Sequence, residues 1–461
     1  LVQRGRIYAD TLARILEILD QPGDLSIDSL GFYEEQYRQF AALREEHLTT
    51  LKNDYAEYYL LRFSPPPVEA KTLRNHLIGS NEVLIEFLER DSLVYLLAIH
   101  NNGQLFLRTK LEQPLGKLIP ILQRQLTHYS DSVYVGLRQL YKNLIGPIES
   151  FIGDRDLVVV PDGNLWYVPF SALLTADPSP QPVSSAQPYL IRDRQVRYLF
   201  SGRIALLHQQ RRMNGQSRGD GALSMSPLNN QSIAGYPRLP SGEKTAKLFR
   251  RLVGDNHGHF FNDSSATKAI FRQYAHNVKL LHINTHTEIN EEHPEESFLL
   301  FYTEDAQVDG HLYRLTAEEI FDLELRADLA VLSACRTAGG QLYRGQGVAN
   351  LARAFAYAGC SNLLVNLWEA RDVTSNELLT LYYPAILQEG KGKSSALADA
   401  QRSYLENYPS SAHPGFWATT IVIGNDLPLK IRTNYSSIWL TVSGIMILLG
   451  GLGLRRARGR N

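Results

Sequence analysis

Residues 327–335 read ADLAVLSAC, and RTAGG, with small residues and a Gly pair, follows at 336–340. A mostly apolar run of this length is typical of a strand that is buried on both faces of a parallel sheet. The run ends at Cys335, one of only two cysteines in the sequence. In open parallel sheets, ligands and reacting groups collect at the carboxyl ends of the strands. Cys335 is therefore the first candidate for a functional side chain.

Two further apolar runs have the same character, VKLLHINTH at 278–286 and SNLLVNLW at 361–368. Helical patterns lie between and after the runs, GVANLARAFAYAG at 347–359 and TSNELLTLYYPAIL at 374–387. Alternation of this kind predicts an α/β fold with a mostly parallel sheet flanked by helices.

The first part of the chain has a different pattern. Residues 1–66 carry apolar residues at helical spacing, and the prolines in SPPP at 64–67 end this helical segment. It could be the last piece of a tetratricopeptide-like array. Residues 82–111 then alternate with a period of two and contain NNG, which predicts three antiparallel strands joined by hairpin turns.

The C-terminal stretch suggests a membrane anchor. Residues 438–454 carry no charge, and the basic tail RRARGR follows at 455–460. Tyr435 and Trp439 stand at one end and the arginines at the other, as at the two interfaces of a membrane. This pattern predicts a single-pass transmembrane helix, a cytoplasmic tail and a catalytic part outside the cytoplasm. The chain opens with Leu1 rather than Met, and we expect it to be a fragment.

Composition excludes some functions. Lys and Arg number 47 and Asp and Glu number 48, so the net charge is −1. The chain therefore lacks the excess of basic residues that is typical of a general nucleic-acid-binding protein. Two cysteines cannot form a disulfide framework, so each thiol is interpreted individually.

His286 ends the run at 278–286, and a single crossover could make this strand a neighbour of the one that ends at Cys335. A thiolate is a nucleophile, and a nearby imidazole can remove its proton and later protonate the leaving amine. Backbone amides in the turn after the cysteine could face the oxyanion. This pair of residues predicts an acyl-transfer site.

Other interpretations of these residues stay open. A buried cysteine is usually a small apolar side chain, and we interpret Cys360 in this way. His282, His286 and His293 could form a zinc site, although His282 and His286 alternate as residues of a strand do and not as residues of a helix.

The sequence resembles the CHAT domain, a caspase-like bacterial module usually preceded by tetratricopeptide repeats. Caspases place the catalytic Cys in a Q-A-C-[RQG]-G context with the His about 50 residues upstream. SACRT at 333–337, with His286, comes close to that pattern. Six blocks recur in the order of the family: LVVVPDGNLWYVPFSAL at 157–173, LPSGEKTAKLF at 239–249, LLHINTH at 280–286, DGHLYRLTAEEIFDLELRADLAVLSACRTAGG at 309–340, QGVANLARAFAYAGCSNLLVNLWEARDVTS at 346–375 and HPGFWATTIVIGN at 413–425.

The resemblance implies a caspase–haemoglobinase-like sheet and a catalytic His286–Cys335 dyad, with no cofactor and no metal. It places the backbone amides of Thr287 and Cys335 at the oxyanion. The family normally has Gly where Thr287 stands, and a β-branched residue is costly at unusual backbone angles. Asp372 matches an acidic position of the family and could select a basic residue before the scissile bond, or be a surface or capping residue.

We divide the chain accordingly. The expected parts are the helical segment 1–66, the N-terminal, pseudo-caspase-like part of the CHAT domain at 67–220, its catalytic part at 221–427, a linker at 428–437, the transmembrane helix 438–454 and the tail 455–461.

Two functions are consistent with the sequence. The first is a caspase-like cysteine peptidase, a hydrolase that cleaves protein substrates and is anchored in the membrane. The alternative is a catalytically weak interaction module that signals through a protein partner bound by preceding repeats. Retention of both His286 and Cys335 favours the first function, and Thr287 slightly favours the second.

Overall fold

The computed structural model describes residues 2–20, 26–54, 68–179, 184–215, 219–233, 235–290, 292–304, 310–333, 341–343, 347–349, 351–368 and 372–433. The chain forms two compact units, Leu1–Glu69 and Ala70–Asn461. In the first unit, helices α1 (Val2–Asp20) and α2 (Ile27–Asp54) pack against each other. Tyr8 and Phe40 lie between them, with their ring centroids 6.3 Å apart.

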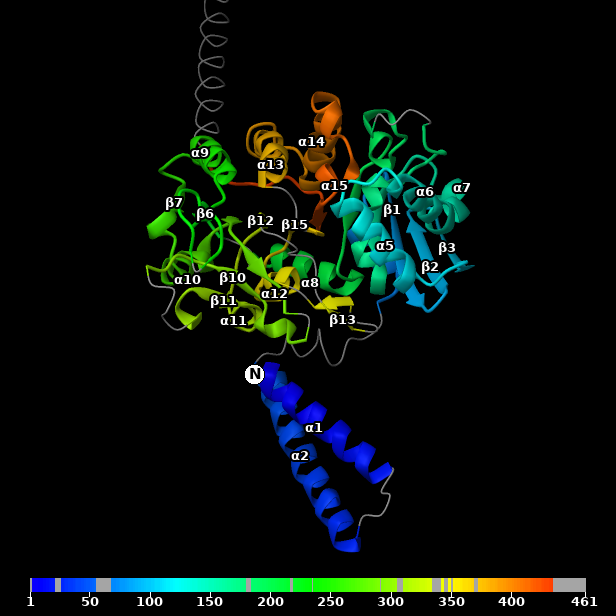
Figure 1. Cartoon of the computed structure of the whole chain (residues 1–461), viewed down its shortest axis with the longest axis vertical. Helices are drawn as coiled ribbons and strands as arrows, with labels where there is room; N and C mark the ends of the chain where they lie inside the picture. Colours follow the sequence, from blue (N-terminus) through cyan, green and yellow to red (C-terminus); the bar gives the residue numbers. More distant parts are fainter. Residues whose placement is uncertain are drawn as a thin grey trace, which may run out of the picture. The chain divides into compact units, whose positions relative to one another are not determined.

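The second unit is built on one large sheet (Figure 1). Its strand order is β3-β2-β1-β4-β5-β16-β15-β12-β8-β6-β7. The strands are β1 (Glu82–Arg90), β2 (Leu93–His100), β3 (Gly103–Lys110), β4 (Asp156–Val160), β5 (Val196–Tyr198), β6 (Ala222–Ser226), β7 (Gly258–Asn262), β8 (Leu280–Asn284), β12 (Leu329–Ser333), β15 (Leu363–Asn366) and β16 (Thr420–Ile423).

The predicted hairpins and the predicted parallel strands are both parts of this sheet. Strands β1, β2 and β3 are antiparallel, whereas β1, β4, β5 and β16 pair in parallel, as do β15, β12, β8, β6 and β7. Strand β16 runs antiparallel to β15 and joins the two parallel sets. The mostly parallel sheet predicted from the buried apolar runs is therefore confirmed.

Helices cover both faces of the sheet (Figure 1). On one side lie α9 (Ser241–Val253), α13 (Asp372–Leu387) and α14 (Lys393–Asn407). On the other lie α8 (Gly202–Met213) and α12 (Leu351–Ala358). The remaining helices are α4 (Ala70–Leu77), α5 (Leu115–Thr127), α6 (Val133–Leu144), α7 (Glu149–Ile152), α10 (Lys268–Tyr274), α11 (Ala317–Phe321) and α15 (Pro414–Trp417).

Two small sheets complete the unit. One has the order β11-β10-β9, with β9 (Thr287–Glu288), β10 (Phe298–Leu300) and β11 (Arg314–Thr316). The other pairs β13 (Gln341–Tyr343) with β14 (Gly347–Ala349).

A buried ion pair fixes the start of β12. Lys393 is 0% exposed, and its Nζ lies 3.5 Å from Asp328 Oδ1 and donates to the Leu427 carbonyl at 2.7 Å. Asn362 donates its side-chain amide to both the carbonyl and the carboxylate of Asp328. Burial is the main reason that the pKa of Lys393 is lowered from its usual value. These contacts hold the N-terminal end of β12, the strand that leads to Cys335, against Lys393 of α14 and against Asn362, which directly precedes β15.

The predicted membrane anchor is corrected. In the described part of the chain, we find no helix with the length and apolar character needed to cross a bilayer. Residues 434–461, which include the predicted segment 438–454, lie outside the described residues. Hydropathy shows only that a segment is apolar, and apolar character alone does not specify a spanning helix. We therefore withdraw the predictions of a transmembrane helix, of a membrane location and of a catalytic part outside the cytoplasm.

Candidate functional site

The two strands that carry the candidate dyad are neighbours. Strands β8 and β12 pair in parallel, with Asn284 opposite Ser333. His286 follows Asn284 by two residues, and Cys335 follows Ser333 by two residues. The predicted adjacency of the two strands is confirmed, although Cys335 itself lies outside the described residues. Its role as a nucleophile stays a prediction.

The imidazole of His286 is oriented by a backbone carbonyl. Its Nε2 lies 2.8 Å from the oxygen of Pro237. Because a carbonyl oxygen can only accept a hydrogen bond, Nε2 is the nitrogen that carries the proton. In the neutral imidazole, Nδ1 then holds the lone pair and can accept a proton. This arrangement gives His286 the tautomer of a general base, with Pro237 as the group that holds it.

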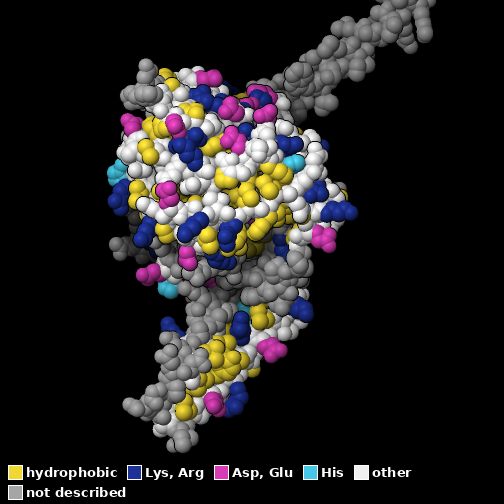
Figure 2. Space-filling model, turned by 90° about the vertical axis from the view of Figure 1, so that its right-hand side faces the viewer, with side chains coloured by type: hydrophobic (Ala, Val, Ile, Leu, Met, Phe, Trp, Pro, Cys, Tyr) yellow, Lys and Arg dark blue, Asp and Glu magenta, His cyan; other side chains and the backbone are white. Residues whose placement is uncertain are grey.

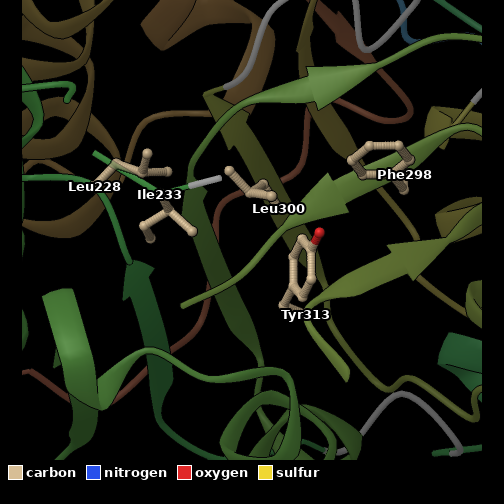
Figure 3. Packing of buried hydrophobic residues seen from close by; sticks show 5 residues of the cluster. All are labelled: Leu228, Ile233, Phe298, Leu300 and Tyr313. Carbon is tan, nitrogen blue, oxygen red and sulfur yellow. The ribbon is translucent and has the colours of Figure 1, made fainter. Parts of the chain in front are cut away.

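The loop that carries Pro237 is fixed by its own backbone bonds. Ile233 and Tyr236 exchange N–H···O bonds at 3.1 and 2.8 Å, and Leu239 N donates to Leu228 O at 2.7 Å. The loop takes part in a hydrophobic cluster with β10 and with the residue that precedes β11 (Figure 3): Leu228, Ile233, Phe298, Leu300 and Tyr313. The carbonyl of Pro237 is therefore presented by a packed loop.

Tyr236 links this loop to β9. Its hydroxyl donates to the Glu288 carboxylate, and its ring lies 5.6 Å from the His286 ring, centroid to centroid. Burial, and then the hydrogen bond and negative charge of Glu288, raise the pKa of Tyr236 to about 12. The phenol stays neutral near pH 7 and keeps its proton for the Glu288 bond.

Thr287 has an ordinary strand conformation. It pairs with Leu299 of β10, and it is not among the described residues with positive φ. Leu300 N donates to His286 O at 3.1 Å, so the next pair along the strands is of the non-hydrogen-bonded type. The backbone N–H of Thr287 consequently points away from β10. Thr287 thus does not have the left-handed backbone conformation that is costly for a β-branched residue.

The remaining predicted site residue is Asp372, which is the first residue of α13. Its side chain lies outside the described residues. Its role in substrate binding stays a prediction.

His282 is a core residue. It is fully buried, its Nδ1 lies 2.6 Å from the Tyr383 hydroxyl, and its ring stacks on Phe249 at 5.5 Å. Burial lowers the pKa of His282 to about 3, so the ring is neutral. His293 lies 3.7 Å from Glu295. Over the ranges that the structure describes, no group of three or more His, Cys, Asp and Glu side chains could hold a metal ion.

Cys360 has the surroundings of a structural thiol. It is 1% exposed, and burial raises the pKa of its thiol. Since the thiolate is the nucleophilic form, this environment opposes reactivity. The burial agrees with our interpretation of Cys360 as a small apolar side chain.

Sequence reasoning missed Pro237 and Tyr236. The contribution of Pro237 comes from a backbone oxygen, which every residue has, so no residue type marks the position. The sequence feature that could have drawn attention to them is that they stand just before the family block at 239–249.

Comparisons with known proteins agree with this fold. The sequence model described as CHAT domain matches residues 136–425. Tetratricopeptide repeat protein 28 of Homo sapiens is 26% identical over 348 residues, which cover 64% of this chain and 13% of that protein. The Mus musculus protein of the same name is 27% identical over 344 residues, with the same coverage. The chain thus spans about one eighth of the length of these curated relatives. Both of these relatives are mammalian proteins, so the bacterial source suggested by the family resemblance is withdrawn.

Among solved structures, the Saccharomyces cerevisiae separase–securin complex superimposes with a TM-score of 0.53 at 10% identity. The match covers 92% of this chain and 38% of that chain. At this identity the likeness concerns the fold alone, and it supports a caspase-like, mostly parallel sheet.

Proposed function

Because this chain belongs to the CHAT domain family, we propose that it is a caspase-like cysteine endopeptidase that acts through His286 and Cys335. The observation that carries the proposal is the bond from His286 Nε2 to the Pro237 carbonyl. It leaves the Nδ1 lone pair of the neutral ring available, and His286 lies two residues beyond β8, which pairs in parallel with the strand that leads to Cys335. A buried core histidine such as His282 has no such arrangement.

The proposed reaction has two stages. The Cys335 thiol gives its proton to His286 Nδ1, and the thiolate attacks the peptide carbonyl carbon. The imidazolium then returns the proton to the leaving amine as the C–N bond breaks, which leaves a thioester on Cys335. Water, deprotonated by the same imidazole, hydrolyses the thioester and releases the acid and the thiol.

Two further roles belong to this proposal. The backbone N–H groups of Thr287 and Cys335 would donate to the developing oxyanion, and the orientation of Thr287 away from β10 supports its part in this role. Asp372 would favour a basic residue before the scissile bond through its charge.

The competing function is an interaction module that signals through a partner bound to repeats. It is favoured by the curated relatives, which are named for tetratricopeptide repeats and are much longer than this chain.

Hydrolysis of a peptide library by the 461-residue chain distinguishes the two functions. We expect Cys335→Ala and His286→Ala each to lower kcat/KM by at least about 100-fold, and the double substitution to cost little more, because the two groups act as one unit. Cys360→Ser is the matched control and should leave turnover unchanged. Turnover that persists in Cys335→Ala would reject the peptidase proposal.

A further inference from the structure

Strand β3 forms an open edge of the large sheet. Within the described residues, β3 pairs on one side only, with β2. Leu111 N donates to Ser92 O at 2.7 Å, just beyond the strand, so odd-numbered residues of β3 direct their backbone groups to β2. The backbone N–H and C=O groups of the even-numbered residues therefore point away from the sheet: Gln104, Phe106, Arg108 and Lys110.

The side chains of the same residues are also exposed. Phe106 is 64% exposed and stacks on Tyr95 of β2, with ring centroids 6.3 Å apart and planes inclined by 24°. Arg108 and Lys110 are exposed, and neither forms an ion pair with any residue that the structure describes. Figure 2 views the unit from the side on which β3 lies and shows hydrophobic side chains gathered there with Lys and Arg side chains beside them. This edge thus offers backbone groups, an aromatic ring and two cations in one row.

We propose that β3 is a docking edge for an extended protein segment that joins the sheet as a further antiparallel strand. Such a strand would satisfy the outward backbone groups of β3. Side chains directly opposite each other interact across neighbouring strands, so Phe106 favours an apolar, β-branched residue, and Arg108 and Lys110 favour carboxylates. In chain order, the segment would read acidic, any residue, acidic, any residue, apolar.

The positive charge of β3 favours an acidic segment over a second copy of the chain as the strand that docks there. Two β3 edges would bring four unpaired cations together, and lysine on an edge strand is a device that prevents self-pairing. An acidic segment converts the same cations into attractive pairs. The edge contains no proline, so its outward donors are complete.

The probe is the acetylated and amidated peptide Thr-Glu-Thr-Glu-Thr-Val-Thr-Gln-Thr, labelled with a fluorophore and titrated with the 461-residue chain. Its glutamates fall opposite Lys110 and Arg108, and its valine falls opposite Phe106. We expect saturable binding by fluorescence anisotropy, which weakens as salt rises from about 0.05 M to about 0.5 M. A control peptide with lysine in place of both glutamates should bind at least about 10-fold more weakly.

Matched variants separate backbone docking from surface attraction. Gln104→Pro removes one outward N–H and leaves the ladder to β2 intact, whereas Gln104→Ala keeps that N–H. Only the proline variant should lose peptide binding, by about 10-fold or more, with unfolding midpoints alike in both variants. Arg108→Glu with Lys110→Glu should reverse the preference between the two peptides.

Amide hydrogen exchange gives an independent measurement. In the free protein the amides of Gln104, Phe106 and Arg108 should exchange fast and those of Leu105 and Leu107 slowly, and saturating peptide should protect the first group. Equal binding by Gln104→Pro and Gln104→Ala, or no new protection, would overturn the proposal. So would a β3-dependent dimer in sedimentation, because the occupant would then be a second copy.

Discussion

Replacing Lys393 by methionine tests the buried ion pair that holds the start of β12. The substitution keeps an unbranched side chain and removes an ammonium that is 0% exposed. The Asp328 side chain, itself 6% exposed, then loses its cation at 3.5 Å, and among the described residues its carboxylate keeps the side-chain amide of Asn362 as a donor. Breaking a buried pair in this way typically costs about 3–5 kcal/mol, because a charge is left uncompensated. We expect a loss of that size in the free energy of unfolding.

Lys391 supplies the control, since it lies two residues away and is also ion-paired. Its Nζ lies 2.8 Å from Asp399 and 3.0 Å from Glu389, but its side chain is 41% exposed. Lys391→Met should therefore cost no more than about 1 kcal/mol. Urea unfolding measures both, as a shift of the midpoint at constant slope. Equal losses in the two variants would refute the reasoning that burial decides the cost.

Three further outcomes are expected. Asp372→Asn should weaken any preference for Arg or Lys before the scissile bond by about 10-fold, or about 1.4 kcal/mol, in a peptide-library profile, and a profile that favours acidic residues would remove Asp372 from the site. Tyr236→Phe, which removes the bond to Glu288, should lower kcat several-fold with little change in KM, and an unchanged kcat would show that this bond does not position the loop. Burial lowers the pKa values of His282 and His208 to about 3, so the unfolded chain takes up protons below about pH 6.5 that the folded chain does not. The free energy of unfolding should therefore keep this contribution above about pH 6.5 and lose it as the pH falls toward about 3. His208→Gln should make the urea midpoint less dependent on pH over this range. An unchanged pH dependence of the midpoint in this variant would contradict the prediction.

The sequence predicted those parts of the fold in which one local pattern decides the outcome. The runs at 278–286 and 327–335 each have an apolar centre that forms a buried strand, β8 or β12, and NNG at 101–103 marks the turn between β2 and β3. The insertion of β16, antiparallel to β15, depends on pairing between distant segments, which no local pattern records.

The candidate site was predictable to a similar extent. A histidine and a cysteine at the ends of two strands can be recognised from their residue types. The Pro237 carbonyl and the Lys393–Asp328 pair cannot, because the first is a backbone group and the second joins residues far apart in sequence. The membrane prediction rested on the local composition of residues 435–460, and no helix among the described residues bears it out.

The central claim is that Cys335, activated by His286, is the nucleophile. The most direct measurement is covalent labelling of the 461-residue chain with a peptidyl electrophile that has a basic residue before the reactive group, followed by mass mapping of the modified thiol. We predict one label, on Cys335, which is lost in His286→Ala and retained in Cys360→Ser. Labelling of Cys360 instead, or undiminished labelling in His286→Ala, would contradict it.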